Sequence, residues 1–78
     1  MMKVYFSENL RYLRKAHKLS QKELGKVFGK TYNAIYQWEC GQTEPSLQEV
    51  GILAEYFDVP VDVLLFDDIT ATEYAVSR

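Results

Sequence analysis

Apolar residues recur three or four positions apart through most of this 78-residue chain, which is the spacing of one face of an amphipathic helix. The pattern predicts five short helices, and we expect no strand because no segment clearly alternates between apolar and polar residues. The expected helices cover about residues 7–17, 21–28, 32–39, 47–57 and 60–66. The sequence therefore predicts an all-α fold in one domain over residues 1–66, followed by a tail over 67–78.

Residues that favour helix ends lie between these segments. Ser20 with Glu23, and Ser46 with Glu49, have the spacing of a capping box, in which each side chain accepts a backbone N–H. The other end signals are Ser7 and Thr31 as N-caps, Gly29 and Gly41 as left-handed C-terminal residues, and Pro60 at a helix start.

The apolar faces of the five helices form the expected core. They consist of Leu10, Leu13 and Ala16, then Leu24, Val27 and Phe28, then Ile35 and Trp38, then Leu47, Val50, Leu53, Ala54 and Phe57, and finally Val61, Leu64 and Leu65. The tail shows no comparable face, so we expect it to fray or to pack on a partner.

The segment from Gln21 to Gly41 holds two short helices joined by only a few residues around Gly29. So short a joint makes the helices cross steeply, and a steep crossing requires a small residue at the contact. Gly25 fits that role, because a glycine inside a helix costs about 1 kcal/mol relative to alanine and should have a packing reason. The outer face of the second of these helices is then left exposed.

That outer face carries large, neutral, hydrogen-bonding side chains instead of the Glu and Lys typical of a solvated helix. They are Tyr32, Asn33, Tyr36 and Gln37. Asn and Gln amides can make paired hydrogen bonds with adenine in the major groove of DNA, and a tyrosine ring can contact a thymine methyl. The pattern predicts base contacts from these four residues, although Tyr32 could equally be a packing residue.

The net charge of −2 is unusual for a nucleic-acid-binding protein, but the charges are unevenly distributed. Residues 1–42 carry eight cations against three anions, whereas residues 43–78 carry one cation against eight anions. One half can therefore present a basic face to phosphates; the alternative is that the lysines only keep helix surfaces soluble. The phosphate contacts predicted beside the outer face are Gln21, Lys22, Lys26, Lys30 and Thr31, helped by backbone N–H groups at the helix starts near 21 and 32.

Several classes of function are disfavoured. No apolar run reaches 18 residues and Met1–Phe6 lacks the pattern of a signal peptide, so we expect a cytoplasmic protein of bacterial or phage origin with no membrane partner. A single cysteine, Cys40, and a single histidine, His17, leave no disulfide, metal site or nucleophile–base pair, so we expect no enzyme, cofactor or small-molecule ligand. We expect His17 to be a helix C-terminal cation or an exposed side chain, and Cys40 to be a partly buried helix-end residue.

Three stretches together resemble the phage repressor and Cro family, also called the XRE family. They are LRYLRKAHKLSQKEL, then AIYQWECGQTEPS after the Gly29 turn, then LAEYFDVPVDVLL, and the likeness covers about residues 7–66. Compared with the family pattern, glycine stands at Gly25 where alanine is common and lysine at Lys30 where an apolar residue is usual. Cys40 takes a position that is often Arg, Asn or Ser.

The resemblance implies a five-helix, lambda-repressor-like DNA-binding bundle in which helix 32–39 recognises DNA. It places base contacts on Tyr32, Asn33 and Gln37, with Tyr36 nearby, and phosphate contacts on Gln21 and on the loop Gly41, Gln42 and Thr43. It also pairs Arg14 with Glu39, which would tie the first helix to the recognition helix.

The leading hypothesis is a transcriptional regulator, most simply a repressor, that binds a palindromic double-stranded operator as a homodimer, since one such domain reads few base pairs. Val63 and Phe66 are the expected dimer contacts. The alternative is an antitoxin or antirepressor-type interaction module on the same fold, using the acidic half and Ile69, Tyr74 and Val76.

Overall fold

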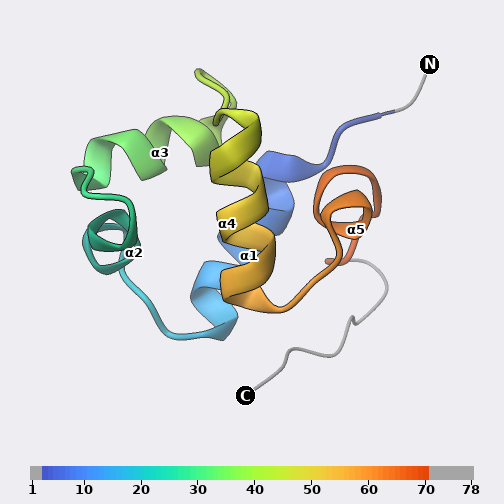
Figure 1. The fold of residues 1–78 in the computed structure, drawn as a ribbon, viewed down its shortest axis with the longest axis horizontal. Coiled ribbons are helices and arrows are strands. Elements are labelled where there is room, and N and C mark those ends of the chain that lie inside the picture. The colour runs from blue at the N-terminus through green and yellow to red at the C-terminus, as the bar shows by residue number, and fades with distance from the viewer. Residues whose placement is uncertain (1–2, 71–78) are drawn as a thin grey trace.

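The computed structural model describes residues 3–70, and they form the five helices that the sequence predicts (Figure 1). The helices are α1 (Phe6–Ala16), α2 (Gln21–Val27), α3 (Tyr32–Cys40), α4 (Leu47–Phe57) and α5 (Val61–Phe66). In Figure 1, α1 and α4 lie in the middle of the molecule, with α2 and α3 on one side and α5 on the other. The prediction of an all-α, five-helix bundle is confirmed.

All five helices contribute to one hydrophobic core. Its buried apolar residues are Phe6, Leu10, Leu13, Leu24, Ile35, Trp38, Val50, Leu53, Ala54, Phe57, Val59, Leu64 and Ile69. Most of the predicted core is therefore correct. Phe28 and Leu65 are half-buried and pack against this cluster.

Both capping boxes are present, with the Ser20 hydroxyl accepting from the Glu23 N–H at 2.9 Å and the Ser46 hydroxyl from Glu49 at 3.1 Å. Gly29 and Gly41 have φ of +67° and +77°, as expected for glycines that end helices.

The prediction that Ser7 caps the first helix is wrong. The helix starts one residue earlier, at Phe6, and Tyr5 takes the N-cap position. The Tyr5 N–H donates to the Leu65 carbonyl at 2.7 Å, and the Phe6 side chain is buried in the core. The Ser7 hydroxyl donates to the Trp38 carbonyl at 2.7 Å, so it joins α1 to α3.

Four residues assigned to the core are instead exposed: Ala16, Val27, Leu47 and Val61. Each is the first or last residue of its helix, where helical spacing does not show whether a neighbouring element covers the side chain. Leu47 is the extreme case, with 91% of its surface accessible.

His17 is the C-cap of α1, so its predicted place at the helix C-terminus is correct, but the alternative of an exposed side chain is wrong because the residue is half-buried. Its ring packs on Phe57 with the ring centres 4.9 Å apart. Its Nε2 atom is buried without a hydrogen-bond partner among the described residues.

The start of the tail packs on the bundle. Ile69 is 1% exposed, which overturns its assignment to a partner surface; Tyr74 and Val76 lie outside the described residues. Asn9, which is fully buried in α1, anchors this segment. Its Nδ2 donates to the carbonyls of Leu64 at 2.8 Å and Asp67 at 2.6 Å, and its Oδ1 accepts from the Ile69 N–H at 3.3 Å.

Candidate nucleic-acid interface

The joint between α2 and α3 is closed around Gly25, as the sequence predicts. A Cβ atom at this position would lie 2.7 Å from the Lys30 carbonyl oxygen and 3.1 Å from that of Thr31. Contacts this short leave no space for any side chain. Phe28 and Trp38 meet edge to face with ring centres 5.5 Å apart, so the joint is also packed on its inner side.

A buried charge network fixes α3 to α1 and α2. The Arg14 guanidinium donates to both carboxylate oxygens of Glu39, at 2.6 and 3.2 Å, and the Gln21 amide donates to Glu39 Oε1 at 3.1 Å. A further Arg14 N–H donates to the Leu19 carbonyl at 2.8 Å. The Arg14–Glu39 pair is therefore as the resemblance implied, and it holds α3 in a fixed orientation.

The four predicted base-contacting residues lie on the outer side of α3, and we call them the recognition ridge. Tyr32 and Tyr36 have 60% and 46% of their surfaces exposed, Asn33 is exposed and Gln37 is half-buried. In contrast, Ile35 and Trp38 on the inner side are buried. The ridge is thus open to solvent and backed by the core.

Tyr36, in the middle of α3, interacts with Cys40 at the end of the same helix. A hydrogen bond with Cys40 is the main cause that raises the pKa of Tyr36 above its ordinary value of 10.0. Cys40 itself is exposed, so the prediction of a partly buried residue is wrong.

The residues predicted to contact phosphates differ in how free they are. Lys22 and Lys26 are exposed on α2. Lys30 is also exposed, but its ammonium lies 3.3 Å from the Glu49 carboxylate, which attaches the α2–α3 turn to α4. Thr31 occupies the N-cap position of α3 without a side-chain cap hydrogen bond, so its exposed hydroxyl is not used by the helix.

Backbone N–H groups of the loop after α3 donate hydrogen bonds within the protein. The Gly41 N–H donates to the Trp38 carbonyl at 3.3 Å, and the Gln42 N–H to the Gln37 carbonyl at 3.0 Å. This geometry gives Gly41 a conformational role and leaves the exposed side chains of Gln42 and Thr43 as the donors that could face a phosphate.

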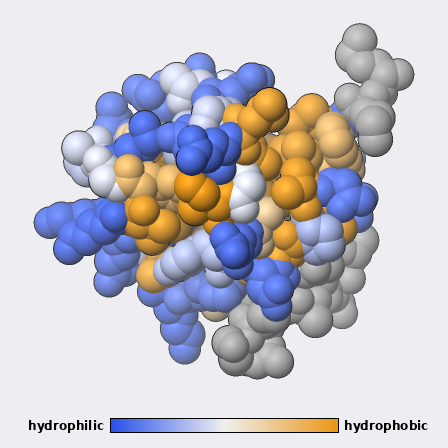
Figure 2. All heavy atoms as spheres, viewed as in Figure 1, coloured by the Kyte–Doolittle hydropathy of each residue, from blue (hydrophilic) through white to orange (hydrophobic). Residues whose placement is uncertain are grey.

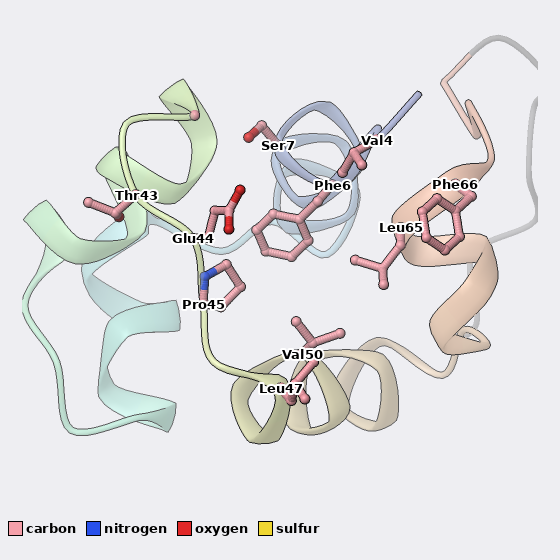
Figure 3. A pocket seen from close by; sticks show the side chains of 11 residues that line it. Val4, Phe6, Ser7, Thr43, Glu44, Pro45, Leu47, Val50, Leu65 and Phe66 are labelled. Atoms are coloured by element: carbon pink, nitrogen blue, oxygen red, sulfur yellow. The ribbon is translucent and has the colours of Figure 1, made fainter. Parts of the chain in front are cut away.

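Beside this loop lies an apolar groove of about 270 Å³ that sequence reasoning missed (Figure 3). It is lined by Val4, Phe6, Ser7, Gly41, Thr43, Glu44, Pro45, Leu47, Val50, Leu65 and Phe66. Figure 3 shows the side chains of Phe6, Val50 and Leu65 turned toward the same space. Figure 2 shows hydrophobic atoms gathered over α4 and toward α5 on this face of the molecule.

A smaller cavity of about 130 Å³, which we call the notch, lies between α1 and α3. Its lining consists of Arg11, Arg14, Gln21, Tyr36, Glu39 and Cys40. Sequence reasoning did not single out Arg11, because the only link that it gave between the first helix and the recognition helix was the structural pair of Arg14 and Glu39. Within residues 3–70, no helix is long and apolar enough to cross a bilayer.

Comparison with known proteins agrees with this geometry. A family model described as helix-turn-helix matches residues 10–64. The HTH-type transcriptional regulator YobD of Bacillus subtilis is 37% identical over 60 residues, which is 77% of this chain and 54% of YobD. Repressor protein C2 of Salmonella phage P22 is 37% identical over 68 residues, 87% of this chain and 32% of C2. The chain therefore spans about half the length of one of these relatives and about a third of the other.

Solved structures resemble this fold closely. The P22 c2 repressor protein in complex with a synthetic operator superposes with a TM-score of 0.73 at 36% identity, covering 81% of this chain and 96% of that one. A transcriptional regulator from Listeria innocua superposes with a TM-score of 0.78 at 23% identity, covering 92% and 73% of the two chains, and shows the same fold. The match over residues 10–64 spans most of α1, all of α2–α4 and most of α5, and the chain belongs to the helix-turn-helix family.

Proposed function

We propose that this protein is a sequence-specific DNA-binding transcriptional regulator, acting as a repressor, with α3 inserted in the major groove. The observation that carries the proposal is the recognition ridge, in which three exposed side chains and the half-buried Gln37 line the outer side of a helix that a buried charge network and a packed joint hold in place. The similarity to repressor protein C2 of Salmonella phage P22 supports it. Because DNA is the target, we place the protein's action in the cytoplasm.

In the proposed interface, some residues recognise the base sequence and others contact phosphates and so position the protein on the DNA. Asn33 and Gln37 offer amides for base edges, and Tyr32 and Tyr36 offer rings for thymine methyl groups. Lys22, Lys26 and Thr31 on one side of the ridge, and the side chains of Gln42 and Thr43 on the other, contact backbone phosphates. Gln21 keeps one amide N–H for the same purpose, since the other donates to Glu39. Lys30 contributes less, because its ammonium faces Glu49.

We further propose that two copies bind together. Half-sites on one face of DNA lie about 34 Å apart, and this molecule measures 30 × 29 × 19 Å, so neighbouring copies would touch at their edges. The edge at the start of α3 carries the exposed cations Lys22 and Lys26, which would repel a second copy. The opposite edge, at the end of α3, carries the apolar groove instead.

The groove and Leu47 suit a two-fold contact. Leu47 projects at the rim of the groove with 91% of its surface exposed, so each copy offers a knob beside a hole. A two-fold axis lets each Leu47 enter the other copy's groove, which is the self-complementarity that such interfaces need. Of the two contacts expected from sequence, Phe66 lines the groove, and Val63 is half-buried against the core.

Selection from a pool of random DNA duplexes tests the proposal. We expect a few rounds of binding and amplification to enrich one sequence with two-fold symmetry. Enrichment of single half-sites would retain the DNA-binding function but reject the dimer. No enrichment above a protein-free control would reject DNA recognition and favour the interaction module.

A further inference from the structure

The geometry points to the notch between α1 and α3 as a binding site for one DNA backbone phosphate, with Arg11 as the residue that holds it. This inference rests on the proposed function and adds a contact from α1, a helix to which neither the sequence motifs nor the comparisons assign any contact with DNA.

The notch carries a positive charge that nothing within it compensates. Two guanidinium groups, those of Arg11 and Arg14, and one carboxylate, that of Glu39, line it. Glu39 is fully engaged, because Arg14 donates to both of its oxygens and Gln21 donates to one. The remaining charge belongs to Arg11, whose side chain has no ion pair with any residue in the range 3–70.

The two arginines differ in a way that assigns their roles. Arg14 has only 10% of its side chain exposed, and its N–H groups donate to Glu39 and to the Leu19 carbonyl. Its role is therefore to connect helices within the fold. Arg11 is exposed, so the N–H groups of its guanidinium are available to a ligand outside the protein. A planar guanidinium matches a phosphate group with two parallel hydrogen bonds, whereas a lysine offers only a point charge.

The position of the notch identifies the anion. Tyr36 belongs both to the notch and to the recognition ridge, so a duplex seated on the ridge brings its backbone to the notch opening. A phosphate bound there would complete the sequence of contacts from α2 through α1 to the loop after α3.

Substitution of Arg11 tests the inference. The affinity of each variant is measured for the DNA duplex selected for binding and for a duplex of scrambled sequence. We expect Arg11→Ala to weaken binding to both duplexes by a similar factor, roughly tenfold at 0.1 M salt, because the contact reads no base. The slope of log affinity against log salt should fall by about 0.9, the value for one phosphate. Arg11→Lys should recover part of the loss.

The matched control is Lys3→Ala, which removes the same charge from a residue whose ammonium lies 4.9 Å from the Tyr5 ring centre, outside the notch lining. A salt slope that falls equally in Lys3→Ala and Arg11→Ala would overturn the inference, because net charge alone would then explain it. So would an unchanged slope in Arg11→Ala, or a loss confined to the selected duplex. Absence of salt-dependent binding by the unmodified protein would reject the proposed function itself.

Cys40 provides a second readout within the notch. It is the single cysteine of the chain, it is exposed, and it lines the notch. We expect the selected duplex to slow alkylation of Cys40 by iodoacetamide in the unmodified protein, and to slow it much less in Arg11→Ala at a DNA concentration that saturates both. Equal protection in the two proteins would show that the duplex covers Cys40 without an Arg11 contact, and would overturn the inference.

Discussion

At the scale of single residues, exposed and buried polar side chains do different work in this molecule. The amides and rings on the outer side of the recognition ridge can contact a ligand. The buried polar groups of Asn9, Arg14 and Glu39 instead connect helices to each other. Substitutions in the two groups should therefore separate cleanly into effects on binding and effects on stability.

Gln37→Ala should alter recognition without altering the fold. Loss of one amide that pairs with a base edge should cost about 1–3 kcal/mol of operator affinity and relax the preference at one base position. Fluorescence anisotropy with the selected duplex and its single-base variants measures both effects. An unchanged preference at every position would remove Gln37 from the base-contacting set.

Asn9→Ala should destabilise the protein. The substitution leaves the Leu64 and Asp67 carbonyls and the Ile69 N–H without their side-chain partner in a buried setting, which costs about 1–3 kcal/mol. Urea unfolding followed by circular dichroism measures the change, with the exposed Lys15→Ala as a control expected within about 0.5 kcal/mol of the parent. Equal stability of the two variants would show that Asn9 does not hold the segment after α5.

At the scale of helices, two glycines that both lie inside a helix differ in the space around them. Gly25 lies where α2 meets the backbone of the following turn, and Gly51 lies on the exposed side of α4 with nothing within 4 Å of a Cβ atom. The helix propensity of each position favours alanine equally, so the space around the residue decides the outcome.

Gly51→Ala should therefore stabilise the protein by up to about 1 kcal/mol. Gly25→Ala should destabilise it, because its Cβ atom would press on the Lys30 carbonyl at 2.7 Å and force the joint apart. Thermal unfolding of the pair compares them directly, and the difference in sign is the result to look for. Stabilisation by both substitutions would mean that α2 and α3 have room to separate.

The two capping boxes should make stability depend on pH. Backbone hydrogen bonds from Ser20 and Ser46 are the leading causes that lower the pKa of Glu23 and of Glu49 from an ordinary value of 4.5. A carboxylate with a lowered folded pKa stabilises the fold above its unfolded pKa, and this contribution is lost as pH falls through the folded value.

The double variant Glu23→Gln, Glu49→Gln should therefore be less stable than the parent at neutral pH, and the gap should narrow as pH falls below about 4.5. Melting temperatures over that pH range measure the gap. The exposed Glu55→Gln, which belongs to neither box, serves as the control. A gap that stays constant with pH would contradict the assignment of this stabilisation to ionised capping residues.

At the scale of the whole molecule, the charged and apolar surfaces lie at opposite ends of α3. Cations flank its start on α2, and the groove with Leu47 flanks its end. This arrangement orients a second copy in one way relative to the DNA, because only one edge can be buried against another protein surface without bringing like charges together.

Leu47→Lys should weaken the assembly of two copies on the operator. A charge at the centre of the proposed contact should lower affinity for the two-fold site roughly tenfold, with affinity for a single half-site retained. Gln48→Lys, which adds the same charge at the next exposed residue of α4, is the matched control. Equal effects of the two substitutions on the two-fold site would place the contact elsewhere.

What the sequence determined by itself is local. Apolar spacing located five helices, the two capping boxes marked the starts of α2 and α4, and glycines marked the ends of the second and third helical segments, because each signal acts within a few residues. The same logic identified the outer face of α3, since a helix whose inner face holds Ile35 and Trp38 must turn the intervening residues outward.

What the tertiary structure decided depends on contacts between residues far apart in the chain. Asn9 meets Asp67 and Ile69, Lys30 turns to Glu49, and Arg11 comes beside Tyr36, although no periodic pattern links any of these positions. The exposure of Leu47 was likewise hidden, because helical spacing shows which side of a helix is apolar but not how much of that side a neighbour covers. The recognition ridge could thus be read from the chain, whereas the notch and the groove exist only where separate helices meet.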